Sequence, residues 1–581
     1  MKETFSVILK MGDAWIHFEN PSEIIAANKK EDVFPALQKL DGFIEDSKPI
    51  AGFISYEAAA GLDNALSHHE TDFPLLKFGV FEKWKNLSEP GGENKKVNAG
   101  RWRFLKEKKN FVKDVQKIKE YIASGDTYQV NYTVRMESDF TGDPFEYFKF
   151  LAENQQAAYA GFVSDSDFSI CSASPELFFS LENESLISQP MKGTAARGLW
   201  HEDDKIKGNS LKNSEKDQAE NLMITDMIRN DMGKVCNPGS VKTRHIFSVR
   251  RLPTVWQMTS EVTGKCSANF SDIIKALFPC ASITGAPKAR TMQIIKELEE
   301  TPRKIYTGSM GYFLPGRRAQ FNVAIRTVLI NKIDNKAEYG VGSGIVWDSH
   351  PGKEYDECKV KALVLKKRPQ NFELIETILL EMGDFFLFDY HIKRLQNSAE
   401  YFGFDLSLKK VKNVCEQIRM LQKNRFYKVR ILVNKKGEIK SDISDIDETG
   451  KGKKLNIGFS DSSINSDNPF LYHKTTVRKI YENARKEAIQ KEWDDVILWN
   501  KKGEITETTV CNVVIKLGES YFTPPIKCGL LPGIFRQYLL DNGEISEKIL
   551  KKEDILEADE IYLINSVRKW QKAIIVSDKR S

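Results

Sequence analysis

The sequence predicts a chain of mixed α and β structure with two separate cores, and three observations support this. First, 581 residues at about 150 per domain leave room for up to ~4 units, enough for two substantial cores. Second, apolar residues at helical spacing predict a helix over 111–124, and short apolar runs alternate with helices up to about residue 365. Third, residues 366–370 are basic, poor in apolar groups and contain a proline. We therefore predict an α+β chain with a boundary at 366–370.

The predicted domains follow from that boundary. Residues 1–100 alternate short apolar runs with turns, and residues 101–365 continue with mixed strands and helices. Residues 371–581 form a second unit, in which strand-like apolar runs occur at 385–388, 429–433 and 513–515.

Composition excludes several classes of protein. Apolar residues make up 41% of the chain, charged residues 29%, and the net charge is +5, which argues against a disordered chain and against a nucleic-acid partner. The N-terminus carries only a three-residue apolar run, and no uninterrupted apolar stretch reaches 18 residues, so we expect neither a signal peptide nor a membrane span. Eight scattered cysteines without a CxxC pair favour reduced thiols in a cytoplasmic protein.

Two acidic pairs in the first unit have matching spacing. Asp217 and Glu220 are three apart in a helix-like segment, and so are Glu354 and Glu357, with Lys361 four residues further on. Taken singly, each pair is typical of a solvated helix face. Taken together, the four carboxylates offer the oxygen ligands that Mg²⁺ prefers.

A lysine in a strand-like run is the other candidate. Lys192 precedes a glycine in the segment 189–194, which follows the run 174–179. Most lysines are solvated surface charges, but a lysine buried beside a cation has a lowered pKa and becomes a nucleophile. The residues alone leave both interpretations open.

Seven motifs occur in an order that resembles the chorismate-utilising enzymes over residues 100–365. They are SPELFF, PMKGT, KDQAENLMITDMIRNDMG, FPCASITGAPKARTMQII, YTGSMGYF, NVAIRT and GSGIVWDSHPGKEYDE, and the segment 52–57 (GFISYE) is similar to the family's N-terminal part. The resemblance implies a β-sandwich with flanking helices. A KGT motif, here at Lys192, is typical of the aminodeoxychorismate synthase branch, whereas anthranilate synthases and the salicylate and isochorismate branches carry alanine there.

The resemblance also implies roles for residues. Lys192 attacks the chorismate ring, Glu176 is the general acid for the departing hydroxyl, and ammonia then displaces the lysine. Mg²⁺ is implied at Glu220 and Glu357, with Asp217 and Glu354 nearby. Positions that hold the substrate are implied at Thr194, Tyr306, Arg326, Gly342, Gly344 and Lys361; the guanidinium of Arg326 suits a carboxylate because it offers a two-pronged donor.

The sequence departs from the family pattern in two places. Gln257 stands where a histidine is usual, and glutamine can hydrogen-bond but cannot exchange a proton near neutrality. The region before residue 100 is shorter than in full-length relatives, so a regulatory tryptophan pocket is not assumed. Nothing in the chain resembles the nucleophile segment of a glutaminase, which implies free ammonia or a separate glutamine amidotransferase subunit.

The second unit contains five further motifs: 391–395 (HIKRL), 473–478 (HKTTVR), 503–512 (GEITETTVCN), 528–536 (CGLLPGIFR) and 565–568 (NSVR). A pyridoxal phosphate site needs a lysine for the Schiff base, an acid beside the pyridine nitrogen, and cationic or amide donors for the phosphate. Taken singly, these charged residues are typical of a solvated surface.

In this order, the five motifs resemble the class IV aminotransferase family over residues 371–581. That family includes branched-chain aminotransferases and aminodeoxychorismate lyase. The resemblance implies a two-subdomain α/β unit of fold type IV, and suggests a homodimer through this unit. It also implies Lys474 as the Schiff-base lysine, Glu507 as the pyridine partner, and phosphate ligands at Arg394, Ile534, Phe535 and Ser566. Phe535 stands where threonine is common, and Asn512 is interpreted as structural support for the loop of Glu507.

Together the resemblances imply synthesis of 4-aminobenzoate, because the first unit would make the compound that a lyase of the second family consumes, with release of pyruvate. Three alternatives stay open at this stage. The first unit could be an anthranilate synthase, although Lys192 argues against it. The second unit could be a branched-chain or D-amino acid aminotransferase, or a non-catalytic module that docks the amidotransferase.

Overall fold

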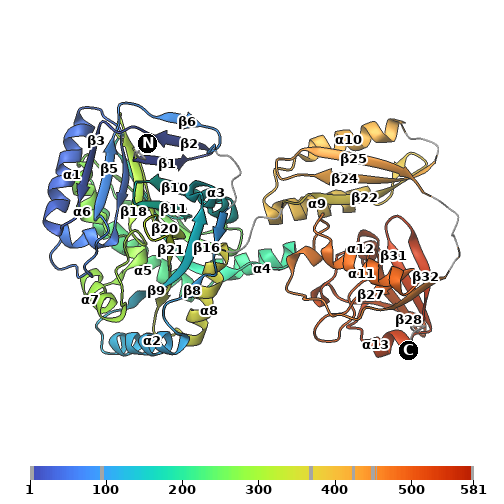
Figure 1. Ribbon diagram of the computed structural model, residues 1–581. Coiled ribbons are helices and arrows are strands. Elements are labelled where there is room, and N and C mark those ends of the chain that lie inside the picture. The colour runs from blue at the N-terminus through green and yellow to red at the C-terminus, as the bar shows by residue number, and fades with distance from the viewer. Residues whose placement is uncertain are drawn as a thin grey trace. The chain divides into compact units, whose positions relative to one another are not determined.

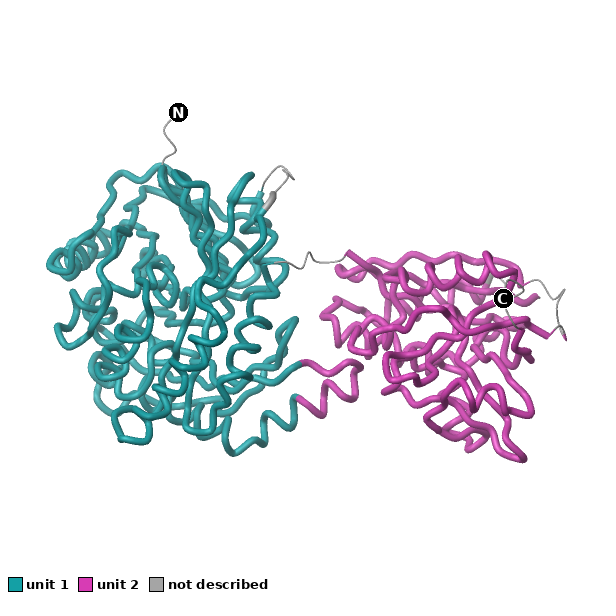
Figure 2. The backbone as a smooth tube through the Cα atoms, turned by 60° about the horizontal axis from the view of Figure 1, so that its bottom comes forward, with its two compact units in different colours: residues 1–196, 208–369 teal, residues 197–207, 370–581 magenta. Residues whose placement is uncertain are grey.

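The computed structural model describes residues 5–91, 97–365, 371–421, 425–446, 452 and 454–576. The chain splits into two compact units, residues 1–196 with 208–369 and residues 197–207 with 370–581 (Figure 2). The predicted linker at 366–370 lies outside the described residues. In the described part of the chain, no helix has both the length and the apolar composition needed to cross a bilayer.

Within the described residues, the first sheet of unit 1 has eleven antiparallel strands. Several of them are labelled in Figure 1. Their order is β17 (Gly285–Ala286), β9 (Gln129–Gly142), β21 (Lys336–Ile345), β20 (Thr327–Asn331), β11 (Phe168–Ser174), β10 (Tyr159–Ser164), β1 (Ser6–Met11), β2 (Ala14–Phe18) and β6 (Lys85–Leu87), while β7 (Val97–Ala99) and β8 (Arg103–Phe104) also pair with β9.

The second sheet, in the part of unit 1 that the structure describes, has ten antiparallel strands. Their order is β14 (Met191–Ala196), β16 (Val255–Lys265), β13 (Ser185–Gln189), β12 (Leu177–Glu182), β19 (Arg318–Val323), β18 (Ser309–Leu314), β4 (Ile50–Ile54), β5 (Leu76–Val80) and β3 (Glu23–Ala27), and β15 (Lys242–Arg251) pairs with β16. Strands from the first 100 residues join both sheets.

Unit 1 is a β-sandwich with flanking helices, as predicted. Apolar side chains from both sheets, such as Val7, Phe18 and Phe53, pack between the sheets. A second core lies between the first sheet and helices α2 (Lys108–Ala123), α3 (Pro144–Gln155), α7 (Lys288–Leu298) and α8 (Pro351–Lys361). A third lies between the second sheet and helices α1 (Lys30–Glu45), α5 (Glu215–Gly233) and α6 (Phe270–Leu277). Helix α2 confirms the prediction over 111–124, since its buried residues follow the helical period.

Unit 2 contains two sheets with separate cores, as expected for two subdomains. The smaller has the order β23 (Asp384–Phe385), β22 (Leu374–Glu381), β24 (Phe426–Val433) and β25 (Ile439–Asp445), and packs on α9 (Phe388–Phe402) and α10 (Leu408–Leu421). The larger has the order β27 (Asp495–Ile497), β26 (Leu455–Phe459), β32 (Lys569–Ile575), β31 (Glu560–Asn565), β28 (Asn512–Leu517), β29 (Ser520–Thr523) and β30 (Ser546–Glu547), and the same subdomain contains α11 (Lys479–Gln490), α12 (Ile534–Asp541) and α13 (Lys552–Leu556).

The strand expectations for this unit hold at 429–433 and 513–515, which lie in β24 and β28. The expectation at 385–388 is mostly wrong, because β23 ends at Phe385 and α9 begins at Phe388. Leu387, with φ near 52°, turns the chain between the two elements.

Residues 197–207 lie in unit 2, although the sequence interpretation placed the whole stretch 101–365 in one domain. Arg197 pairs with Asp204 at 2.8 Å and lies 4.5 Å from the ring of Tyr401. The hydroxyl of Tyr401 donates to the Gly198 carbonyl at 2.7 Å, and the Trp200 ring packs 5.3 Å from that of Tyr472. This segment, at the start of α4 (His201–Lys212), follows directly after β14.

Replacing Trp200 with alanine should loosen residues 469–473, because the indole packs on Tyr472. A partly buried aromatic contact of this kind is worth about 2 kcal/mol, below the ~3–5 kcal/mol of a fully buried ring. Amide hydrogen exchange should be faster at 469–473 in the variant. The matched control is Trp347→Ala in unit 1, where the tryptophan is 57% exposed. Unchanged exchange at 469–473 would show that residues 197–207 do not stabilise unit 2.

Candidate active site

The first pocket lies in unit 1 and has a volume of about 300 Å³. All the site residues that the sequence implied for this unit line it, although they come from widely separated parts of the chain: Glu176, Lys192, Thr194, Asp217, Glu220, Tyr306, Arg326, Gly342, Gly344, Glu354, Glu357 and Lys361. Strand β14 carries Lys192 and Thr194, helix α5 carries one acidic pair, and helix α8 carries the other.

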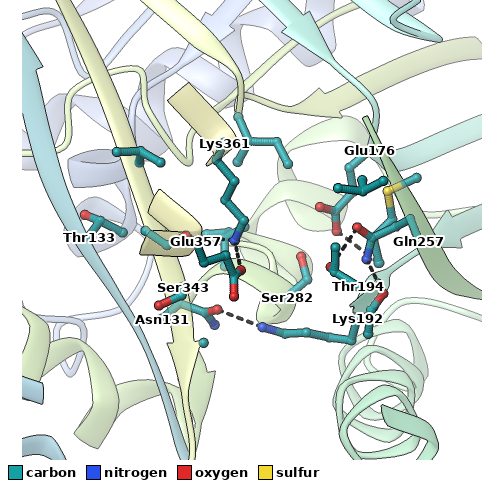
Figure 3. Close-up of a pocket in the computed structure, with 18 of the residues that line it drawn as sticks. Asn131, Thr133, Glu176, Lys192, Thr194, Gln257, Ser282, Ser343, Glu357 and Lys361 are labelled. Carbon is teal, nitrogen blue, oxygen red and sulfur yellow. Dashed lines mark hydrogen bonds and ion pairs between the residues drawn. The ribbon is translucent and has the colours of Figure 1, made fainter. Parts of the chain in front are cut away.

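The amine of Lys192 points into this pocket and is held by an amide (Figure 3). Its Nζ donates to Oδ1 of Asn131, on β9, at 2.7 Å. Burial lowers the pKa of Lys192, while Glu220 opposes the shift and Lys361 adds to it. A lowered pKa leaves more of the free amine available as a nucleophile near neutrality.

Glu176 is buried, and its pKa is raised to about 7, mainly because burial disfavours the charged form. The backbone N–H of Met191 donates to its Oε1 at 3.3 Å, and the Ser282 side chain also hydrogen-bonds to it. Both contacts favour the anion and limit the rise in pKa. A carboxyl group with this pKa can hold and release a proton at neutral pH.

Gln257 forms hydrogen bonds with the strand that carries Lys192. It lies directly opposite Thr194 in the pairing of β14 with β16. Its Nε2 donates to the Gly193 carbonyl at 2.9 Å, and its Oε1 accepts from the Thr194 hydroxyl at 3.1 Å. The residue that replaces the family's usual histidine therefore fixes β14 through two hydrogen bonds.

Three glycines keep one face of β21 free of side chains. Gly340, Gly342 and Gly344 alternate along the strand and so face the same side. A Cβ at Gly340 would lie 2.2 Å from the Tyr306 ring, and one at Gly344 would lie 2.8 Å from Nζ of Lys192. The pocket therefore depends on the absence of side chains at these positions.

Two cationic side chains of the pocket, Lys361 and Arg326, are both held by contacts that involve α8. Lys361 pairs with Glu357 at 2.5 Å and donates to the Gly342 carbonyl at 2.9 Å. The guanidinium of Arg326 donates to the Lys361 carbonyl. These contacts place two fixed positive charges on the wall of the pocket, where an anionic ligand could bind.

The four carboxylates from α5 and α8 suit a hard cation chemically. Burial raises the pKa of Glu220, and the negative charges of Asp217 and Glu354 raise it further, while Lys192 opposes the shift. A bound Mg²⁺ would relieve this repulsion and needs only a few carboxylate oxygens. Across the described ranges, no three His, Cys, Asp or Glu residues are already arranged as metal ligands.

The second pocket lies in unit 2 and has a volume of about 650 Å³. It brings together Arg394, Lys474, Glu507, Ile534 and Ser566. Phe535 lies in the adjacent apolar core instead, with its ring stacked on Tyr538 and close to Phe386 and Trp570. Only its backbone N–H is therefore left as a group for the phosphate.

Lys474 lies in the loop between a short 3₁₀ turn (Pro469–Leu471) and α11. The Ile375 N–H, on β22, donates to its carbonyl at 2.8 Å and so ties this loop to the smaller sheet. The pKa of Lys474 is lowered to about 8 by burial and by the positive charges of Arg394 and Arg478. An amine with this pKa reacts readily with an aldehyde near neutrality.

Glu507 is held in place by two donors to Oε1, the hydroxyl of Tyr481 at 2.7 Å and the N–H of Leu531 at 3.1 Å. Burial raises its pKa to about 7, so a cationic partner such as a protonated pyridine nitrogen would favour its charged form. Asn512 donates from Nδ2 to the Leu531 carbonyl at 3.0 Å and forms a bridge with Glu507, which confirms its structural role.

The guanidinium of Arg394 and the N–H groups at the start of α12 are hydrogen-bond donors of the kind that suit a phosphate. Arg394 binds both oxygens of Glu376, at 2.9 and 2.7 Å, and the Pro532 carbonyl at 3.2 Å. Helix α12 begins at Ile534, and N–H groups in a first helical turn attract anions. With Lys474 and Glu507, these residues fit the aldehyde, the pyridine nitrogen and the phosphate of pyridoxal phosphate.

Sequence reasoning missed four residues that complete the two sites: Asn131, Ser282, Glu376 and Tyr481. Ser282 lies within the run FPCASITGAPKARTMQII and could have been found there. Asn131 and Glu376 lie within strands, and only contacts with distant parts of the chain bring them to the sites.

Comparison with known proteins agrees with both units. The family model of the chorismate binding enzymes matches residues 6–367, and that of the class IV amino-transferases matches residues 373–574. The chain therefore belongs to the chorismate binding enzymes and carries a class IV amino-transferase domain, which implies pyridoxal phosphate.

Three relatives illustrate the match. An aminodeoxychorismate synthase component 1 of Bacillus subtilis is 38% identical over 277 residues, 47% of this chain and 58% of the relative. An anthranilate synthase component 1 of Aquifex aeolicus is 36% identical over 305 residues, 51% of this chain and 61% of the relative. The crystal structure of anthranilate synthase component I from Streptococcus pneumoniae has a TM-score of 0.54 at 23% identity, covering 63% of this chain and 93% of that one, and shows the fold alone. The chain spans less than two thirds of these curated relatives.

Lys474 should react with a limiting amount of acetic anhydride well before exposed lysines do. With a pKa of about 8, about half of its amines are unprotonated at pH 8, against fewer than ~1% for a lysine at the ordinary ~10.4. Mass spectrometry of the peptides, in protein freed of any bound aldehyde, should show labelling that rises as the pH passes through about 8. Labelling of Lys474 no faster than that of exposed lysines at pH 8 would contradict the lowered pKa.

Proposed function

We propose that this chain converts chorismate to 4-aminobenzoate in two steps, one in each unit. The observation that carries the proposal is the amine of Lys192, which has a lowered pKa and lines the same pocket as Glu176, an acid with a pKa of about 7. A nucleophilic amine and a proton donor in one pocket suit displacement of a poor leaving group such as hydroxyl. The relative from Bacillus subtilis is named for the first of these steps.

In the first step, the amine of Lys192 forms a bond to the ring of chorismate, and the bond between the ring and its hydroxyl oxygen breaks. Glu176 gives its proton to the departing oxygen, so that water leaves. Such proton transfer typically contributes ~10²–10⁴ in rate. Ammonia then forms a carbon–nitrogen bond at the carbon that carried the hydroxyl, and Lys192 is displaced, which gives 4-amino-4-deoxychorismate. Arg326 and Lys361 hold the carboxylates of the substrate.

Two components complete this step. Glu220 and Glu357, with Asp217 and Glu354, would hold Mg²⁺, which when bound supplies positive charge to an anionic substrate. Ammonia comes from solution or from a separate glutamine amidotransferase subunit.

In the second step, Arg394, Ser566 and the N–H groups of Ile534 and Phe535 would hold the phosphate of pyridoxal phosphate, and Glu507 would face its pyridine nitrogen. The cofactor, when bound, supplies an electron sink. Lys474 would hold the aldehyde carbon of the cofactor until the amine of the substrate takes its place. The freed Lys474 removes the ring proton, pyruvate leaves, and the ring becomes aromatic as 4-aminobenzoate.

A second candidate for the first unit is anthranilate synthesis, which the relative from Aquifex aeolicus favours. Lys192 argues against it, because a lysine in this motif is typical of the other branch. For the second unit, the family match itself leaves transamination of an amino acid as the alternative.

The two lysines provide the test. With chorismate, ammonia, Mg²⁺ and pyridoxal phosphate, the wild-type protein should release 4-aminobenzoate and pyruvate, as identified by mass spectrometry. Lys192→Ala should stop formation of 4-amino-4-deoxychorismate, because the nucleophile is lost. Lys474→Ala should let that compound accumulate, because only the second step is lost.

Exposed lysines of the same units supply the controls. Lys113→Ala and Lys486→Ala should leave both steps unchanged, because both side chains are in solvent. Release of 2-aminobenzoate by the wild-type protein would establish anthranilate synthesis instead. Formation of 4-aminobenzoate by Lys474→Ala at the wild-type rate would refute the lyase assignment.

A further inference from the structure

A buried ionic network lies behind the first pocket, and its centre is Arg303, which is 1% exposed. Arg303 follows α7, and its guanidinium binds both oxygens of Glu299, with Nε to Oε2 at 2.9 Å and Nη2 to Oε1 at 2.6 Å. The ring of Tyr56 lies 4.6 Å from the guanidinium carbon. A cation this deeply buried is stable only when its donors are satisfied, so its geometry is closely fixed.

The other donors of Arg303 reach three residues that line the pocket. Nη2 donates to the Asn131 carbonyl at 2.7 Å, while Nη1 donates to the Ile283 carbonyl at 3.1 Å and to the Thr307 hydroxyl at 3.3 Å. These residues belong to β9, to the 3₁₀ turn Ala281–Ile283 and to the segment before β18. One guanidinium therefore ties together three walls of the pocket.

Asn131 connects this network to the reacting amine. Its backbone carbonyl is held by Arg303, and its Nδ2 donates to the Thr284 carbonyl at 3.0 Å. The remaining amide oxygen, Oδ1, accepts from Nζ of Lys192 at 2.7 Å (Figure 3). Two hydrogen bonds therefore connect Arg303 to the amine of Lys192, one from Arg303 to Asn131 and one from Lys192 to Asn131.

The segment 52–57, to which the proposed chemistry gives no role, anchors the other side of Arg303. The carboxylate of Glu57 accepts from the Arg303 N–H at 2.7 Å, and the Tyr56 N–H donates to the Lys304 carbonyl at 2.9 Å. These bonds hold the backbone at 303–304 against the 3₁₀ turn Tyr56–Gly61, which follows β4. The GFISYE motif thus supports the pocket from behind.

We propose that Arg303 is a positioning residue of the first site: it fixes Asn131, and through Asn131 it fixes the amine of Lys192. The inference rests on the proposed function for the identity of the reaction, but the contacts concern the amine itself. A planar guanidinium can satisfy Glu299 and three separate acceptors together, which the single ammonium of a lysine cannot do.

The test measures Lys192 directly. Acylation of Lys192 by limiting acetic anhydride at pH 8 needs no substrate. The hydrogen bond to Asn131 favours the charged amine, so its loss should lower the pKa of Lys192 and speed acylation, by about threefold or more. We expect this in Asn131→Ala, Arg303→Gln and Arg303→Lys. The double variant Asn131→Ala/Arg303→Gln should react no faster than Asn131→Ala, because both changes act through one contact.

Turnover of chorismate supplies the second measurement. Because Arg303 orients the amine without touching substrate, both Arg303 variants should lower kcat about tenfold or more, while KM changes by less than about threefold. Arg317→Gln is the matched control, since Arg317 also donates to three backbone carbonyls of unit 1, those of Asn183, Cys266 and Ala268. It should retain wild-type acylation and turnover.

Each outcome decides one claim. Unchanged acylation of Lys192 in both Arg303 variants, or additive effects in the double variant, would overturn the positioning role. Arg303→Lys keeps a charge opposite Glu299 and serves where Arg303→Gln does not fold; failure of both to fold would assign Arg303 to the core alone and would also overturn the role. Absence of chorismate turnover in the wild-type protein, with the acylation pattern as expected, would refute the proposed function and leave the role of Arg303 intact.

Discussion

The pairing of β9 with β21 is the constraint on which the first site depends. In this register Asn131 lies opposite Gly344, Thr133 opposite Gly342 and Arg135 opposite Gly340. Each of these three polar residues therefore lies opposite a position without a side chain, and the space left on that face admits the amine of Lys192 from the other sheet. A slip of one residue would turn the polar set of β9 to the opposite face and close this space.

Burial lowers the pKa of a lysine in both units, although the two units have different folds. Lys192 and Lys474 both have lowered pKa values because burial disfavours the ammonium. Each lines a pocket with a carboxyl group whose pKa burial raises to about 7, Glu176 in one case and Glu507 in the other. Desolvation thus favours the free amine over the ammonium in both pockets.

Sequence reasoning reached the parts of the structure that depend on local pattern. The helical period of the apolar residues predicted α2. The order of the motifs predicted site residues that the structure brings together in two pockets. Sequence reasoning missed Asn131 and Arg303, because their importance comes from strand pairing and from contacts between residues that are 61 and 172 positions apart. It also missed the assignment of residues 197–207 to unit 2, since tertiary packing rather than local composition determines where they lie. At 385–388 the apolar run had suggested a strand, but β23 ends at Phe385 and the chain turns at Leu387, which has a positive φ, into α9.

The central claim is that one chain carries out two successive steps at two independent lysines. Its most direct test is to mix purified Lys192→Ala with purified Lys474→Ala in the presence of chorismate, ammonia, Mg²⁺ and pyridoxal phosphate. Each variant alone should release no 4-aminobenzoate, and the mixture should release it, because one protein supplies 4-amino-4-deoxychorismate and the other consumes it. A mixture in which 4-amino-4-deoxychorismate accumulates without release of 4-aminobenzoate would contradict the account.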